Sequence, residues 1–203
     1  MSNEKPAVDF YFDFSSPYGY LAATQINALA ARHKRNVNWR PILLGPMFKA
    51  AGTAPLIGVP LKGPYSLRDI LRTARLLKIS YTQPAVFPIG TQNAARAFYW
   101  LADRDPAKAQ QFALACYATF FGNGIDISSG EKVADIAATL GEDRATVLAA
   151  MANPVIKERL KAEIEAALAR GVFGSPFMFV DGEPFWGNDR LDQVEAWLRT
   201  GGF

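Results

Sequence analysis

The 203-residue sequence contains one cysteine, one histidine and no apolar run long enough to cross a membrane. With Cys116 alone, the chain cannot form an internal disulfide, a C-x-x-C redox pair or a thiolate zinc site. With His33 alone, histidine-rich metal sites are excluded, and a Ser-His-Asp triad would have to use this residue as its base. We therefore expect no metal centre.

The sequence also lacks a strong excess of charge of one sign. The net charge is +3, and basic residues are spread along the chain, which argues against a nucleic-acid partner. Half of the residues are hydrophobic and a fifth are charged, as in globular proteins with one sizeable core. Residues 1–6 lack the apolar core of a signal peptide, so we expect a cytoplasmic protein with no membrane partner.

The chain opens with the pattern of a β-α-β unit. Residues 8–14 are aromatic and β-branched, as in a buried strand. Ser16 and Pro17 form a helix-start signal, and apolar residues then keep helical spacing to about Lys34. Residues 36–43 indicate a second strand, which such units place parallel to the first.

The middle and the end of the chain follow a different pattern. Residues 45–65 are rich in glycine and proline and are expected to be mostly loop, whereas residues 66–171 indicate helices, one of them with a capping box from Ser128 to Glu131. Two short apolar strands, 177–180 and 183–186, flank an Asp-Gly turn, and Asn188 or Asp189 is expected to cap a last helix.

This order predicts an α/β protein with a thioredoxin-like fold and a large all-helical insertion. The thioredoxin-like domain is expected to comprise residues 1–45 plus 171–203, with a loop and helical insertion domain over 46–170. Redox proteins of this fold carry C-x-x-C where Ser16-Pro17-Tyr18-Gly19 stands here. Dithiol exchange by this chain alone is therefore excluded.

Ser16 nevertheless stands at a helix N-terminus, which presents free N–H groups and a partial positive charge. A thiolate brought by a ligand would be stabilised there, and the Ser16 hydroxyl could donate a hydrogen bond to its sulfur. The alternative is that Ser16 only caps the helix.

Two further motifs fit a peptide-like ligand. Thioredoxin folds place a cis-proline where Ser175-Pro176 stands, and a cis bond would turn the Ser175 backbone toward an extended ligand; a trans turn proline is the alternative. Asn188 and Asp189 could bind an amino-acid end group, with N–H groups taking the carboxylate and Asp189 the ammonium. Simple helix capping is the alternative.

Four segments together resemble the 2-hydroxychromene-2-carboxylate isomerase family, over about residues 7–199. They are residues 10–18, 62–65, 172–176 and 186–190. This family is related to the kappa-class glutathione transferases and belongs to the DsbA-like branch of the thioredoxin superfamily.

The resemblance implies glutathione as cofactor and assigns roles to individual residues. Ser16 resembles the catalytic serine beside the glutathione sulfur, and the other glutathione-binding residues would be Pro17, Tyr18, Thr53, Lys62, Ser175, Pro176, Asn188 and Asp189. Phe48, Lys49, Trp186 and Gly187 would line the substrate side. The family's usual asparagine is Thr53 here, which puts that glutathione contact in doubt. Gly19 replaces a common serine, a change that we expect to matter little.

The implied reaction interconverts 2-hydroxychromene-2-carboxylate and trans-o-hydroxybenzylidenepyruvate in naphthalene breakdown. A thiolate that adds to the conjugated system and leaves again would permit the cis–trans rotation. Lys49 is the candidate cation for the substrate carboxylate, unless it is simply a solvated lysine. A kappa-type transferase or peroxidase and a non-catalytic binding protein are the alternatives, although Phe87-Pro88 and the segment from Trp186 favour the isomerases. The family tendency suggests a homodimer.

Overall fold

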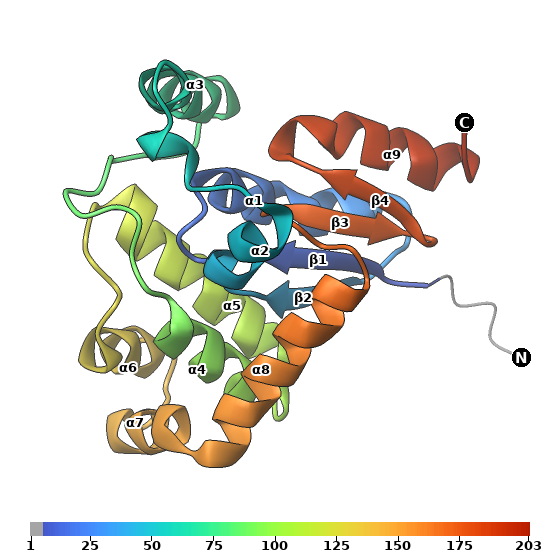
Figure 1. Ribbon diagram of the computed structural model, residues 1–203. Coiled ribbons are helices and arrows are strands. Elements are labelled where there is room, and N and C mark those ends of the chain that lie inside the picture. Colours follow the sequence, from blue (N-terminus) through green and yellow to red (C-terminus); the bar gives the residue numbers. More distant parts are fainter. Residues whose placement is uncertain (1–5) are drawn as a thin grey trace, which may run out of the picture.

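The computed structural model describes residues 6–203 and contains a four-stranded mixed sheet with helices on both faces (Figure 1). The strands are β1 (Val8–Phe12), β2 (Val37–Pro41), β3 (Phe177–Val180) and β4 (Glu183–Trp186), in the spatial order β2-β1-β3-β4. β1 and β2 are parallel, and both other pairings are antiparallel. The predicted β-α-β opening and the final hairpin are thus confirmed.

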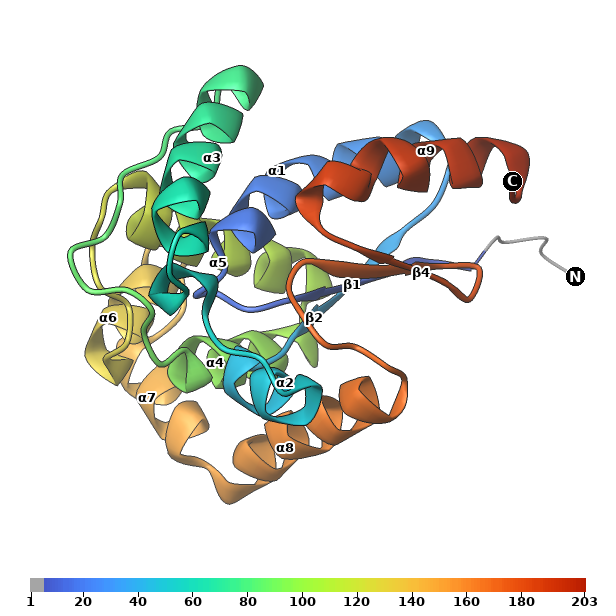
Figure 2. The ribbon, with the colours of Figure 1, turned by 45° about the horizontal axis from the view of Figure 1, so that its top comes forward.

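The sheet lies between two helical layers (Figure 2). Helices α1 (Pro17–Arg32) and α9 (Leu191–Thr200) cover one face, and α2 (Leu44–Ala51) and α8 (Pro154–Ala169) lie across the other. The remaining helices are α3 (Lys62–Leu77), α4 (Gln92–Ala102), α5 (Pro106–Tyr117), α6 (Gly130–Ala138) and α7 (Arg144–Ala152), with short turns at η1 (Leu56–Gly58), η2 (Ala118–Gly122, of π type) and η3 (Asn188–Arg190).

The expectation of a loop over 45–65 is wrong at both ends. Residues 44–51 form α2, because Pro46 falls in the first turn, where the missing N–H would have no partner in any case. Gly52 then ends the helix with a φ of 63°. The uniform helical prediction for 66–171 is also too broad, since residues 79–91 run without a helix and contain a cis peptide bond between Phe87 and Pro88.

Two predicted helix caps are wrong. The cap of α6 is Ser129 rather than Ser128, and it accepts a hydrogen bond from the Lys132 amide at 3.1 Å. Neither Asn188 nor Asp189 caps α9, because the short turn η3 intervenes and α9 begins after Arg190 without a side-chain cap. Those two side chains are therefore available for other contacts.

Aromatic rings from the sheet and from α5 form the centre of the core. Phe12 contacts Phe10, Phe14, Trp39 and Tyr117, with ring centroids 5.2–5.9 Å apart. Its ring and those of Phe10, Phe14 and Tyr117 are fully buried. Such rings bury large apolar areas, so they fix β1 and the residues that follow it firmly against the helices.

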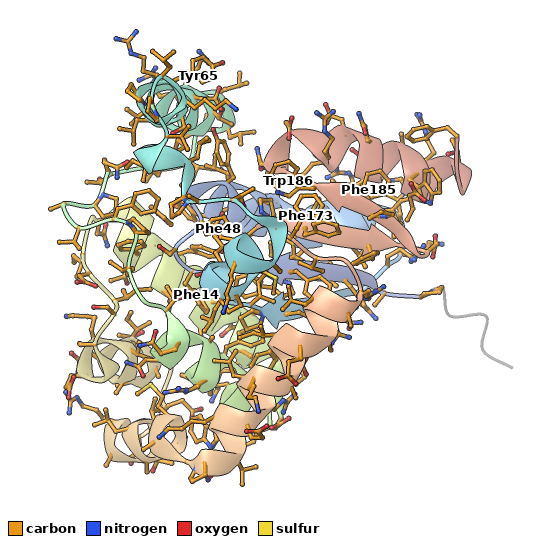
Figure 3. All side chains as sticks on the ribbon, in the orientation of Figure 1. Phe14, Phe48, Tyr65, Phe173, Phe185 and Trp186 are labelled. Carbon is orange, nitrogen blue, oxygen red and sulfur yellow. The ribbon has the colours of Figure 1, made fainter. Side chains whose placement is uncertain are left out.

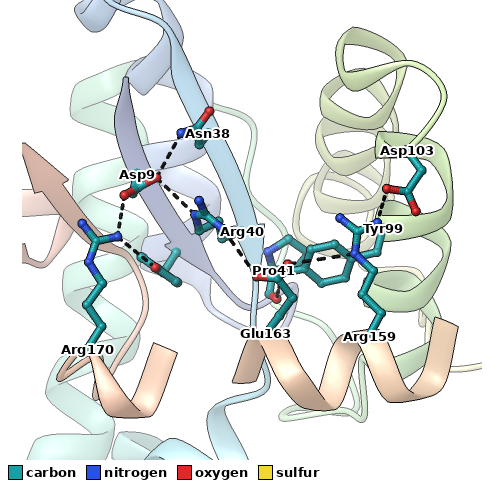
Figure 4. Close-up of polar contacts among 10 residues, drawn as sticks. Asp9, Asn38, Arg40, Pro41, Tyr99, Asp103, Arg159, Glu163 and Arg170 are labelled. Carbon is teal, nitrogen blue, oxygen red and sulfur yellow. Dashed lines mark hydrogen bonds and ion pairs between the residues drawn. The ribbon is translucent and has the colours of Figure 1, made fainter. Parts of the chain in front are cut away.

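An ion-pair network fastens α8 to the sheet (Figure 4). Asp9 of β1 accepts hydrogen bonds from Arg170 and Arg40, and Arg40 also contacts Glu163 of α8 at 3.4 Å. Burial opposes the ionised form of Asp9, but these hydrogen bonds together hold its pKa below the ordinary value. The network thus joins the end of the helical segment to the first strand.

The single cysteine and the single histidine both lie outside the candidate site in structural surroundings. Cys116 is a free, fully buried thiol whose pKa is raised by that burial. His33 lies at the C-terminal cap of α1, 3.3 Å from the Glu195 carboxylate. Within residues 6–203 no helix has the length and apolar character that a membrane span requires. Residues 1–5, which carry the expectation about a leader, lie outside the described part.

Candidate active site

Ser16 stands at the start of α1, directly behind the end of β1. Its hydroxyl accepts a hydrogen bond from the Gly19 amide at 3.0 Å and donates one to the Ser175 carbonyl oxygen at 2.9 Å. The residue is only 4% exposed. The capping role of Ser16 is therefore confirmed, and the same hydroxyl also links two segments that lie 159 positions apart in the chain.

The first turn of α1 leaves one amide for a ligand. Pro17 has no N–H, the Gly19 amide bonds to Ser16 Oγ, and the Tyr20 amide bonds to the Ser16 carbonyl oxygen. The amide of Tyr18 has no partner within residues 6–203. Together with the helix dipole, this amide makes the start of α1 favourable for an anion.

Ser175 and Pro176 lie against this helix start, and the peptide bond between them is cis. Ser175 Oγ accepts a hydrogen bond from the Asp13 amide at 3.0 Å, while the Pro176 carbonyl accepts one from Gly187 at 3.0 Å. The Ser175 amide has no partner in the described part of the chain. The expectation of a cis bond at Pro176 is therefore confirmed, and the Ser175 amide beside Ser16 can pair with an extended ligand.

The turn η3 also lies beside α1. Asn188 Oδ1 accepts a hydrogen bond from Gln25 of α1 at 3.2 Å. The Tyr18 hydroxyl donates to Asp69 of α3 at 2.7 Å. The pKa of Tyr18 is raised chiefly by burial and by Asp69, with a smaller contribution from the nearby charge of Asp189. Asn188 and Asp189, the pair predicted to bind an amino-acid end group, therefore lie beside α1, the helix that Ser16 caps.

Two aromatic side chains come from segments next to the cis-proline, Phe173 from the residues before it and Trp186 from β4. Phe173 and Trp186 meet edge to face with centroids 4.9 Å apart, and both are substantially exposed. Figure 3 places Phe48 of α2 on the same face of the molecule. A Cβ at Gly174 would lie 2.4 Å from the Trp186 indole nitrogen, so a larger residue there would displace this ring. We missed Phe173, although an aromatic residue directly before Gly-Ser-Pro is a visible signal.

Three residues that were predicted to contact glutathione or substrate form no contact with Ser16 or Ser175 among the hydrogen bonds and ion pairs of residues 6–203. Lys49 on α2, Lys62 at the start of α3 and Thr53 beyond α2 are all exposed. In the described part of the chain, none of their side chains forms a hydrogen bond or an ion pair. Their assignment to glutathione or substrate therefore still rests on the resemblance alone.

Gly19 and Asp13 show what the sequence reasoning overlooked. A Cβ at Gly19 would lie 2.7 Å from the Tyr117 hydroxyl and 2.9 Å from Ser175 Oγ, so the packing around this position favours glycine, a constraint that the sequence alone does not reveal. Asp13 is a buried carboxylate directly behind the site, and the signal for it was an acidic residue inside an aromatic strand.

A surface hollow of about 500 Å³ lies beside β4 and α9, with Trp186 and Arg190 among its lining residues. Neither Ser16 nor Ser175 contributes to this hollow. We place the candidate site at Ser16 rather than in this hollow. The amides of Tyr18 and Ser175, unpaired within residues 6–203, are found beside Ser16, and such groups can bind an anion or a peptide-like ligand.

Three features define this chain as a thioredoxin-like protein of DsbA type. They are the β-α-β unit, the cis-proline beside the start of the first helix, and the helical segment inserted between the two halves of the sheet. Residues 7–199 match the family model of the DSBA-like thioredoxin domain. More narrowly, the chain belongs to the family of 2-hydroxychromene-2-carboxylate isomerases, and it is thus an enzyme of an isomerase family.

Two isomerases and one transferase are among the proteins similar to this chain. The isomerase of Sphingobium xenophagum is 34% identical, and the match covers 94% of this chain and 97% of that protein. A solved structure of a 2-hydroxychromene-2-carboxylate isomerase superimposes with a TM-score of 0.86 at 30% identity, over 95% of this chain and 94% of the other. Glutathione S-transferase kappa 1 of Rattus norvegicus is 24% identical, over 94% and 92% of the two chains. The kappa-class transferases are therefore also related.

Proposed function

We propose that the protein is a glutathione-dependent isomerase that interconverts 2-hydroxychromene-2-carboxylate and trans-o-hydroxybenzylidenepyruvate. The observation that carries this proposal is the meeting of Ser16, the free amide of Tyr18 and the open backbone of Ser175 at one helix start. Similarity to named isomerases supports the reaction, and similarity to kappa-class glutathione transferases supports the cofactor.

The donor set suits a thiol that is part of a peptide. The unpaired Ser175 amide and the Ser175 carbonyl match the peptide groups of a cysteinyl residue. Asn188 and Asp189 lie beside α1 for an amino-acid end group, although Asp189 also contacts Arg190 at 3.1 Å. Free glutathione would supply a nucleophile that adds reversibly to a conjugated double bond.

The residues of the chain then have separate tasks. The Tyr18 amide and the dipole of α1 stabilise negative charge on a sulfur. The Ser16 hydroxyl, which bonds to the Ser175 carbonyl in this structure, is released for the sulfur when a ligand amide occupies that carbonyl. A hydrogen bond to the charged form lowers the pKa of a thiol and raises its thiolate fraction at neutral pH.

On the substrate side, we propose that Phe48 and the Phe173–Trp186 pair hold the planar aromatic ring. Lys49 on α2 would take the carboxylate, since it is exposed and forms no ion pair in residues 6–203. Gly187 has a φ of 110°, a backbone conformation that favours glycine. We propose that this conformation orients its two neighbours, Trp186 for the substrate and Asn188 for glutathione. We also propose that the enzyme acts as a homodimer, as the family resemblance implies.

The test is an absorbance assay on 2-hydroxychromene-2-carboxylate with purified protein. We expect turnover that requires glutathione, leaves the glutathione concentration unchanged and yields the trans isomer. Conjugation of a generic electrophile without isomerisation would favour the kappa-type transferase instead. Absence of both activities, with the protein folded, would contradict the proposed enzyme and favour a binding protein.

A further inference from the structure

Asp13 occupies an unusual place between the two halves of the candidate site. It follows β1 directly, and its side chain is almost fully buried at 4% exposure. Within residues 6–203 no lysine, arginine or histidine forms an ion pair with it. A buried carboxylate without a cation is costly unless hydrogen-bond donors surround it.

Three donors supply that compensation, and each comes from the beginning of a helix. Oδ1 accepts hydrogen bonds from the Ser15 amide at 2.8 Å and from the Thr91 hydroxyl at 2.7 Å, and Oδ2 accepts one from the Leu44 amide at 2.6 Å. Ser15 immediately precedes the cap of α1, Thr91 is the cap of α4, and Leu44 is the first residue of α2. Residues at the beginnings of three helices therefore donate hydrogen bonds to one carboxylate.

The contact with Leu44 is the most informative, because α2 has no cap of its own. The residue in the cap position, Leu43, is apolar and forms no side-chain cap hydrogen bond. Asp13 thus caps α2 from a distance of 31 positions in the chain. Its backbone is fixed as well, since its carbonyl accepts from Tyr117 and from the Ser16 amide.

The amides of Ser15 and Leu44 are obligatory donors, whereas the Thr91 hydroxyl, which donates to Oδ1 in this structure, can also accept. The two amides can only donate, so both carboxylate oxygens must accept, which favours the ionised form. Burial raises the pKa of Asp13, and the hydrogen bonds from Ser15, Thr91 and Leu44 offset part of this rise.

We propose that Asp13 is a positioning residue that holds the first turn of α2, and with it Phe48 and Lys49, in register with the Ser16 start of α1. The inference rests on the proposed function for the roles of Ser16, Phe48 and Lys49. The hydrogen bonds themselves do not depend on that function. Asp13 contacts neither substrate nor cofactor and acts through the helices that it joins.

The variant Asp13→Asn tests this role, because its amide nitrogen cannot accept. The one remaining oxygen can accept either from Ser15 or from Leu44, and the NH2 group then faces the other backbone amide as a second donor. In both orientations the side chain no longer joins the start of α1 to the start of α2. We expect the KM for the aromatic carboxylate to rise about 10-fold, while the Kd for glutathione stays within about threefold. Hydrogen exchange of the amides in 44–48 should accelerate, with circular dichroism unchanged.

Thr91→Val is the matched control, since it removes one donor from Oδ1 and leaves the Leu44 contact intact. We expect KM and Kd to stay within about threefold of wild type. A folded Asp13→Asn protein with wild-type KM and wild-type exchange in α2 would overturn the proposal. A parallel rise of KM and Kd would also overturn it, because general destabilisation predicts that result.

A second pair of variants removes the donor instead of the acceptor, in case Asp13→Asn does not fold. Leu44→Pro deletes the amide hydrogen at a first helical position, where proline is tolerated, and Leu43 already has the extended backbone that precedes proline. Leu44→Ala loses the same side-chain packing but keeps the N–H.

We expect a KM at least threefold higher in Leu44→Pro than in Leu44→Ala, and equal values would contradict the positioning role. If the wild-type protein shows no isomerase turnover, the proposed function fails. Faster α2 exchange in Leu44→Pro than in Leu44→Ala would still support the role of Asp13 in that case, and equal exchange would refute it.

Discussion

Replacement of Ser16 by alanine is expected to lower kcat about 10²-fold, the scale on which a single lost donor to a reacting anion acts. The variant loses the hydroxyl that we assign to the glutathione sulfur. It also loses the cap of α1 and the link to the Ser175 carbonyl oxygen. Loss of a cap costs only about 0.5–2 kcal/mol of stability, so the protein should remain folded.

The control for this variant is Ser129→Ala, which removes a cap of the same type from α6, away from the candidate site. Ser129→Ala should lose the stability of a cap alone and Ser16→Ala more, because Ser16 is buried and also bonds to the Ser175 carbonyl, but only Ser16→Ala should lose turnover. Steady-state rates at saturating glutathione measure the difference. Unchanged turnover in Ser16→Ala would reduce Ser16 to a helix cap and remove its chemical role.

Replacement of Gly19 by alanine is the second change with a large expected effect. The new methyl group would lie 2.7 Å from the Tyr117 hydroxyl, 2.9 Å from Ser175 Oγ and 3.1 Å from the Ser16 Cβ. The two oxygens bond to the backbone of Asp13, at 2.8 and 3.0 Å, so neither moves without breaking a hydrogen bond. Overpacking of this kind typically costs about 1–3 kcal/mol.

We therefore expect Gly19→Ala to lose about 1–3 kcal/mol of stability and at least 10-fold in turnover, because Ser16 and Ser175 both shift. Gly45→Ala in α2 is the comparison, since nothing lies within 4 Å of a Cβ built there. Because Pro46 follows directly and disfavours the helical conformation for a residue with a Cβ, we expect no gain from helix propensity and a change in stability of at most about 1 kcal/mol. Thermal unfolding and steady-state kinetics of the two variants distinguish the outcomes, and wild-type behaviour of Gly19→Ala would refute the packing argument.

Local patterns were sufficient for the parts of the fold that depend on local physics. The run of aromatic and β-branched residues predicted β1, the serine–proline pair predicted the start of α1, and Asp181-Gly182 predicted the hairpin. The error over 44–51 came from counting Pro46 as a helix breaker without considering its place in the first turn. The last helix cap was misplaced because a three-residue turn intervenes.

The candidate site was predictable only in part, since its key contacts join distant segments. Ser16 was recognised as a cap, but its bond to Ser175 crosses 159 positions. The need for glycine at position 19 arises from Tyr117 and Ser175, neither of which lies near it in sequence. Asp13 escaped notice because its partners, Ser15, Thr91 and Leu44, belong to three separate helix starts. Periodicity and spacing in the sequence describe single elements, so they do not predict that residues from three separate helices bond to one carboxylate.

The central claim is that Ser16 and the start of α1 stabilise a glutathione thiolate. It is tested most directly by titrating the ultraviolet absorbance of the thiolate in the complex of the protein with glutathione, for wild type and Ser16→Ala. We predict a thiol pKa at least one unit below the ordinary value of about 8.5 in wild type, and a return toward that value in the variant. An ordinary pKa in wild-type protein saturated with glutathione, or an equally low pKa in both proteins, would contradict the role assigned to Ser16.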